Sequence, residues 1–263
     1  MRIKKQLLKF IILSSFLLGQ VDLLNSRFKF TPGISYDLSI QSPKDYLGYD
    51  LGTEYTLYAD VMSYLRNLAQ ESDRVSIHSY GKTHEKRALE YLVITSSSQR
   101  GRLEEIRKNN LRLTDPRTIN NRVADKIIQE NPGVYWLSYN VHGNEASSTE
   151  AVMQVAYRLA AGQDRETRAI IDNSVVILVP CVNPDGRDRY VYWYKSAQSQ
   201  VTNADEFDYE HDEPWPGGRT NHYWFDLNRD WVWLVHPESQ GRIAAYQHWM
   251  PQIHVDYHEM GFN

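Results

Sequence analysis

The chain has 263 residues, of which 41% are hydrophobic and 24% are charged, and its formal net charge is −4. These proportions are typical of a globular protein with one substantial core, and the acidic balance without any basic stripe argues against a nucleic-acid partner. The single cysteine, Cys181, excludes an internal disulfide.

The first residues predict a secretory signal peptide. Four basic residues among the first nine precede a short apolar run over residues 10–18, which is too short for an ordinary membrane span. We expect residues 1–19 to be removed on export, leaving a secreted or periplasmic protein without stable membrane association; an uncleaved anchor is the alternative. An exported chain without disulfides suits a bacterium.

Residues 20–50 are expected to form an extended lead-in to a catalytic domain over residues 51–263. Periodicity and turn residues predict, in chain order, a helix over 55–70, strands over 74–80 and 89–95 around a hairpin turn, helices over 102–108 and 124–130, a strand over 134–140, a helix over 147–160, a strand over 175–180, a helix over 237–249 and a strand over 252–258. This alternation predicts an α/β fold with a mixed twisted sheet flanked by helices.

The most informative motif is His-x-x-Glu, formed by His142 and Glu145, read together with the distant His258. Two histidines and one glutamate are the ligand set of a catalytic zinc that leaves a position open for water. The motif lies at a predicted strand-to-helix turn, the usual place for a site in an open α/β sheet. A hydrogen-bonded loop histidine is the alternative interpretation of His142.

Two further motifs follow. The sequence Asn-Pro-Asp-Gly at 183–186 is a strong turn signal after the predicted strand. The sequence Asp-Leu-Asn-Arg at 226–229 places an arginine beside an asparagine in a loop, where such residues are usually solvated. Near a zinc site the arginine becomes a candidate anion clamp, because guanidinium binds carboxylate through two parallel hydrogen bonds.

These motifs, in this order and with Asp-Tyr-His at 256–258, resemble the zinc carboxypeptidases of the carboxypeptidase A type, from about Tyr55 to the last residue. Each motif is modest alone, but four in the right order are highly specific. The resemblance implies a zinc carboxypeptidase-like fold and one Zn²⁺, and the signal peptide and cysteine usage predict an exported bacterial member of the family. It implies hydrolysis of the C-terminal bond of a peptide or protein substrate with a free C-terminus.

The resemblance also implies roles for single residues. It assigns His142, Glu145 and His258 as the zinc ligands. It assigns Asn228 and Arg229 as the residues that bind the terminal carboxylate of the substrate. It implies that Asp226 orients His142, since a ligating histidine normally donates its other ring N–H to such a partner. Asp256, beside His258, is a further candidate for that supporting role.

An arginine upstream of the Asn-Arg pair should help to polarise the scissile carbonyl. Arg219 lies ten residues before Arg229, a spacing that resembles the cytosolic branch of the family, and is the favoured choice. Arg187 and Arg189 remain alternatives, although both directly follow the turn and are interpreted as surface or structural residues.

The chain departs from the family pattern at its end. The family's general base is a glutamate well beyond the second zinc histidine, and a substrate-capping tyrosine also lies there, whereas this chain stops at Asn263. We therefore expect the truncated front part of a longer enzyme, inactive by itself. Glu259 could replace the base only if the strand ends before it, because successive strand side chains face opposite ways.

The other histidines are not expected to bind the same metal. His254 lies four residues from His258, about 13 Å along a strand, and is expected to be buried or hydrogen-bonded. The rest have no competing ligand spacing and are interpreted as ordinary polar residues, with His222 and His236 bordering the cleft: His78, His84, His211, His222, His236 and His248.

The acidic segment 196–218 lacks periodicity and is interpreted as a rim of the cleft, with a solvated insertion as an equal alternative. Two other functions stay open. One is a related zinc amide hydrolase, such as an N-acyl amino acid deacylase. The other is a non-catalytic module that binds peptides or cell wall and lacks a base.

Overall fold

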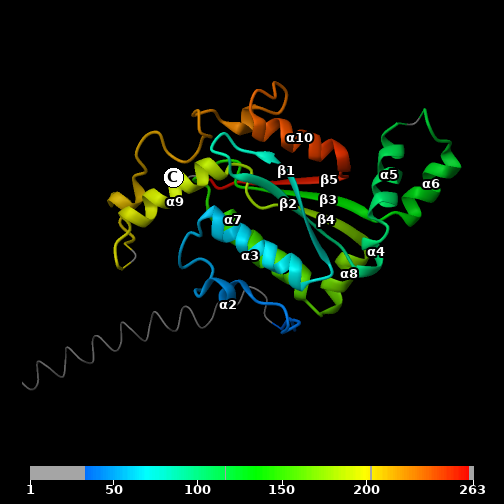
Figure 1. Ribbon diagram of the computed structural model, residues 1–263, viewed down its shortest axis with the longest axis horizontal. Helices are drawn as coiled ribbons and strands as arrows, with labels where there is room; N and C mark the ends of the chain where they lie inside the picture. The colour runs from blue at the N-terminus through cyan, green and yellow to red at the C-terminus, as the bar shows by residue number, and fades with distance from the viewer. Residues whose placement is uncertain (1–32, 116, 202, 261–263) are drawn as a thin grey trace, which may run out of the picture. The chain divides into compact units, whose positions relative to one another are not determined.

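The computed structural model describes residues 33–115, 117–201 and 203–260 (Figure 1). The expected signal peptide over residues 1–19 and the beginning of the lead-in lie outside this described part. None of the helices in the described ranges has the length and apolar character needed to cross a membrane.

Five strands form one mixed sheet in the order β1-β2-β4-β3-β5 (Figure 1). β1 (Val75–Lys82) and β2 (Ala88–Ile94) form an antiparallel hairpin, and β2 is also antiparallel to β4 (Ser174–Val179). β3 (Gly133–Tyr139) runs parallel to both β4 and β5 (Ile253–Tyr257), which is the edge strand. The predicted mixed α/β fold is therefore confirmed.

Helices cover both faces of the sheet. α3 (Tyr58–Glu71) and α7 (Ser147–Ala161) pack on one face, and α10 (Pro237–Trp249) packs on the other (Figure 1). The strands supply both cores because side chains alternate between faces. On β3, Trp136 faces the core under α10 and Tyr139 faces the core under α7.

The remaining helices include three that the sequence pattern did not predict, namely α4, α8 and α9, and a short one, α2, in the lead-in expected to be extended. Their bounds are α2 (Pro43–Leu47), α4 (Ser97–Arg100), α5 (Leu103–Thr114), α6 (Asn121–Glu130), α8 (Arg165–Asn173), α9 (Pro184–Ala197), and the 3₁₀ turns η1 (Tyr209–His211) and η2 (Leu227–Arg229).

The Asn-Pro-Asp-Gly sequence opens a helix rather than forming an isolated turn. Asn183 caps α9, because its side-chain oxygen accepts the Gly186 N–H at 3.0 Å. Pro184 occupies the first helical turn, where no N–H is needed for the helix ladder. A cap followed by proline is a helix start signal as much as a turn signal.

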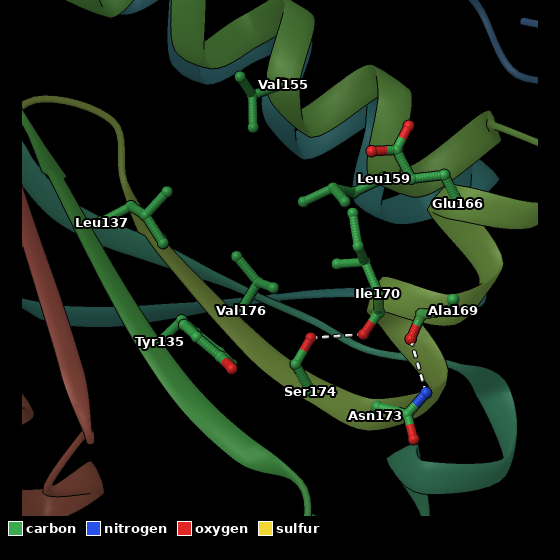
Figure 2. Close-up of a pocket in the computed structure, with 10 residues that line it drawn as sticks. All are labelled: Tyr135, Leu137, Val155, Leu159, Glu166, Ala169, Ile170, Asn173, Ser174 and Val176. Carbon is green, nitrogen blue, oxygen red and sulfur yellow. Dashed lines mark hydrogen bonds between the residues drawn. The ribbon is translucent and has the colours of Figure 1, made fainter.

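An apolar hollow opens between α7, α8 and the strands β3 and β4 (Figure 2). Leu137 and Val176 line it from the sheet, and Leu159 and Ile170 line it from the helices. At the adjacent sheet edge, the apolar side chains of β5 are also accessible to solvent: Ile253 is 48%, Val255 39% and Tyr257 36% exposed.

Candidate metal centre

The carboxyl ends of β3 and β5 bring two distant histidines together. The strands are parallel neighbours, and their last pair is Tyr139 with Tyr257, whose rings stack at 4.3 Å. His142 follows β3 closely and His258 follows β5 directly, so both lie at the same edge of the sheet. This is where sites of open α/β sheets form.

The side chains of His142, Glu145 and His258 converge, with their potential ligand atoms within 4.8 Å of one another. The Nδ1 atom of His142 lies 2.7 Å from one Glu145 carboxylate oxygen, and the Nδ1 atom of His258 lies 3.0 Å from the other. Two imidazole nitrogens and a carboxylate form a donor set that suits a divalent ion such as zinc.

The other ring nitrogens point away from this cluster. Nε2 of His142 lies 3.0 Å from Asp226 Oδ1, and Nε2 of His258 lies 3.1 Å from Asp256 Oδ2. A histidine that donates its Nε2–H to a carboxylate keeps its Nδ1 lone pair for a metal. The residues therefore fit a metal ion bound through the two Nδ1 atoms.

Asp226 is suited to this supporting role by its charge. Burial raises the pKa of the Asp226 carboxyl, but the Asn228 N–H, the His142 ring and the Arg219 guanidinium outweigh burial and hold that pKa below its usual value. The carboxyl is therefore an anion near neutral pH and can accept a hydrogen bond from the Nε2–H group of His142.

Asn140 shapes the loop that carries His142 and Glu145. This buried residue has a φ of 58°, in the left-handed region that asparagine tolerates better than most residues. Its side-chain nitrogen donates to the carbonyl oxygens of His142 at 2.6 Å, Gly143 at 3.2 Å and Glu145 at 2.8 Å. Sequence reasoning placed Asn140 in the strand and missed it; a polar residue after a buried strand was the available signal.

Gly143, inside the His-x-x-Glu motif, allows close approach of another segment. A Cβ at this position would overlap the backbone of Gly186 and Arg187 and the carbonyl of Gly218. The Asn183 side chain then connects the start of α9 to the next segment, donating to the Arg219 carbonyl at 3.2 Å. Contact between these three loops places Arg219 near the histidines.

Of the three arginines considered for the carbonyl, Arg219 contacts the cluster. Its guanidinium lies 3.1 Å from Asp226 and 3.5 Å from Glu145, and the side chain is 46% exposed. Arg189 donates instead to backbone carbonyls at 2.8 and 3.0 Å. Arg187 is completely buried, so the surface alternative for Arg187 is wrong and the structural one is right.

Asn228 and Arg229 lie in η2, immediately after Asp226. The Asn228 N–H donates to Asp226 at 2.8 Å, and its side-chain oxygen accepts the Trp231 indole N–H at 3.2 Å. The exposed Arg229 guanidinium donates to the Asn228 carbonyl at 3.2 Å. Within the described ranges no carboxylate forms an ion pair with Arg229, which leaves most of its donors for a ligand.

A family model described as zinc carboxypeptidase matches residues 61–252, well over half of the chain. The chain belongs to this family. The match spans the His-x-x-Glu motif, the start of α9 and the Asp-Leu-Asn-Arg segment, in agreement with the resemblance drawn from the motifs.

Several solved structures are similar to this chain. Thrombin activatable fibrinolysis inhibitor aligns with a TM-score of 0.50 and 14% identity over 84% of this chain and 49% of that chain. A metallo-carboxypeptidase from Burkholderia cenocepacia aligns with a TM-score of 0.49 and 18% identity, over 79% of this chain and 42% of that chain. Carboxypeptidase A from Helicoverpa armigera aligns with a TM-score of 0.48 and 16% identity, over 79% of this chain and 46% of that chain. The chain thus spans less than half the length of these proteins. No curated protein sequence matches it.

In this zinc carboxypeptidase chain, Glu259 lies beyond the end of β5 and is engaged elsewhere. Its Oε1 accepts the Ser147 N–H at the start of α7 at 2.7 Å, and its own N–H donates to Glu145 at 3.0 Å. The alternation argument does not apply after Tyr257, where the strand ends. The hydrogen bond from the Ser147 N–H, rather than strand alternation, therefore fixes the direction of the Glu259 carboxylate.

The other histidines differ in outcome. His254 is hydrogen-bonded as expected, with its Nε2 3.1 Å from the Ser138 hydroxyl. Two of the histidines interpreted as ordinary polar residues, His84 and His236, meet beside Glu238. These two histidines are 152 residues apart, so no local spacing could reveal them.

The acidic segment 196–218 reaches the loop of the zinc carboxypeptidase motif. Glu213 accepts the Asn144 side-chain N–H at 2.9 Å and also accepts the Gly218 N–H. Beyond it, the Trp215 and Trp224 rings lie 4.8 Å apart and are 77% and 57% exposed. The end of this segment is thus beside the candidate metal centre.

Proposed function

We propose that the protein is a zinc-dependent metallocarboxypeptidase that hydrolyses the C-terminal peptide bond of peptides or proteins. The observation that supports this most is the convergence of the two Nδ1 atoms on Glu145, with each Nε2 atom bonded to an aspartate. Zinc bound to His142, Glu145 and His258 would polarise a carbonyl and lower the pKa of water towards ~7.

The arginines divide the recognition of substrate between them. Arg219, which contacts Glu145 and Asp226 and remains half-exposed, can turn to the carbonyl oxygen and stabilise the negative charge that develops there. Arg229 and Asn228 are proposed to hold the terminal carboxylate, so that cleavage removes the last residue. We do not propose Glu259 as the proton acceptor, since its carboxylate is bonded to Ser147.

The test compares one peptide as the free acid and as the C-terminal amide, using the full-length enzyme. We expect the amide to be cleaved far more slowly. Arg229→Ala should slow cleavage of the free acid selectively by roughly ten- to a hundredfold, because a charge-assisted hydrogen bond contributes about 1.5–3 kcal/mol. Arg229→Lys should restore only part of the rate, because an ammonium cannot form the bidentate fork.

Arg117→Ala is the matched control, since this arginine is 87% exposed and pairs with its neighbour Asp115. Its kinetics should equal those of the wild type. Equal turnover of the free acid and the amide by the wild type would rule out carboxypeptidase action and leave an endopeptidase or a deacylase.

A further inference from the structure

A second pair of histidines and a glutamate lies outside the candidate metal centre. His84 occupies the turn between β1 and β2, while His236 and Glu238 open α10. Their potential ligand atoms lie within 4.8 Å of one another. We propose that His84, His236 and Glu238 form a second site for a divalent ion of the zinc type. This site shares no residue with the proposed catalytic one and goes beyond the proposed function.

Glu238 carries the argument because half of its carboxylate has no partner. The residue is 1% exposed, and one oxygen accepts the His84 backbone N–H at 3.3 Å. The other oxygen is buried without a hydrogen bond, and Nε2 of His84 lies 3.8 Å from it. Burying a carboxylate oxygen unsatisfied is costly, and a bound cation removes that cost.

The two imidazoles present nitrogens to the same point. Nε2 of His84 lies 3.1 Å from Nδ1 of His236, and the rings are nearly perpendicular at 85°. If Nε2 of His84 donates its proton to Nδ1 of His236, that proton is no longer available to the buried Glu238 oxygen. One ion placed between the nitrogens and the free oxygen would satisfy all three atoms.

Asn221 shows which form of His236 is present. Its side-chain oxygen accepts the backbone N–H groups of Tyr223 at 3.0 Å and Phe225 at 3.1 Å, so its nitrogen is the atom that faces Nδ1 of His236 at 3.0 Å. Nδ1 therefore holds a lone pair, as a metal ligand requires. The ion would take this lone pair in place of the Asn221 hydrogen bond.

The His84 side chain is 24% exposed and lies beside an open pocket. The pocket is lined by Glu85, Arg189, His222, Tyr223 and Trp224, and the Tyr223 ring contacts the His84 ring edge-to-face at 4.7 Å. The exposed part of His84 gives an ion access to this side of the site. Once bound, the ion would connect the β1–β2 turn to the start of α10, two segments distant in sequence.

The experiment counts ions bound by full-length protein that has been stripped of metal and dialysed against Zn²⁺ or Co²⁺. We expect two ions in the wild type, and one each in His84→Ala, Glu238→Gln and His258→Ala. The double variant His84→Ala/His258→Ala should bind none. Loss of a ligand should weaken the second ion by more than the roughly 10–100-fold typical of supporting residues.

His222→Ala is the matched control, because this nearby exposed histidine bonds Glu85 instead and should leave both ions in place. The melting temperature gives a second measurement: zinc should raise that of His258→Ala but not that of the double variant. One ion in the wild type, or two in both His84→Ala and Glu238→Gln, would overturn the proposal in favour of an ion-free His84–Glu238 pair. Unchanged zinc in His258→Ala would instead refute the catalytic site alone.

Discussion

Asn140 supports the candidate metal centre without being a ligand. Its side chain holds three carbonyl groups of the loop that carries His142 and Glu145, and its oxygen accepts the Thr149 hydroxyl at 3.2 Å. The loop is therefore pre-organised before any ion binds. Metal affinity should depend on this residue, because ligands that must first be ordered bind more weakly.

We predict that Asn140→Gly lowers zinc affinity roughly 10–100-fold, the range observed when residues supporting a metal ligand are removed. Glycine adopts the positive φ freely, so this variant removes the hydrogen bonds without adding strain. Asn140→Ala should be worse, since it adds the strain. Competition with a chelator gives the affinity.

Asn131→Gly is a suitable control, because it also removes an amide that donates to a carbonyl, that of Ile106, away from the loop. Equal zinc affinities for wild type and Asn140→Gly would show that the loop holds its shape without these bonds.

At the scale of elements, a polar chain crosses the pairing of β3 and β5. The Trp136 indole N–H donates to the Ser138 oxygen at 2.8 Å, and the Ser138 hydroxyl is hydrogen-bonded to Nε2 of His254 at 3.1 Å. Burial lowers the pKa of His254, and Arg242 lowers it further against the opposing effect of Asp256. The neutral ring therefore suits the folded state.

This arrangement predicts a pH-dependent stability. The pKa of His254 in the folded protein lies below its unfolded value of about 6.5. The contribution of His254 to the free energy of unfolding is therefore complete above pH of about 6.5, and it is lost as the pH falls from there through the folded pKa. The difference in urea midpoint between wild type and His254→Gln should be largest near pH 8 and smaller near pH 5. A difference that stays constant with pH would contradict this.

At the scale of the whole molecule, a buried ion pair joins three distant segments. The Arg187 guanidinium in α9 lies 2.5 Å from Glu150 in α7 and donates to the Thr56 carbonyl before α3 at 2.8 Å. Both the N–H and the hydroxyl of Thr56 donate to the same carboxylate, each at 2.7 Å. All of these groups are buried.

We predict that Arg187→Met lowers the free energy of unfolding by about 3–5 kcal/mol, because it leaves the Glu150 charge buried and unpaired. Adding Glu150→Gln should recover part of this loss, since an amide carries no charge and still accepts from Thr56. Urea unfolding measures both variants.

Arg158→Met is the control, because it removes an arginine from the more exposed ion pair with Glu166. It should lower the free energy of unfolding by no more than about 1 kcal/mol. If Arg187→Met were equally mild, the buried pair would not connect the three segments as proposed.

The sequence by itself determined the features that depend on neighbours along the chain. The apolar run of β4, the helical spacing of α7 and the proline-led start of α10 are local patterns, and α10 has the predicted bounds of 237–249. The order of the four motifs identified the family for the same reason. α8 was missed although Asp164 caps it by accepting the Thr167 N–H, a local signal that was available.

Only the tertiary structure decided the rest, because sheet order and burial arise from contacts between residues far apart in the chain. Spacing alone favoured Arg219 among three arginines, and burial in the folded chain then separated Arg187 from Arg219. The meeting of His84 with His236 required the hairpin turn of β1 and β2 to lie against the start of α10. No spacing within a short window encodes such a contact, since 152 residues separate the two histidines along the chain.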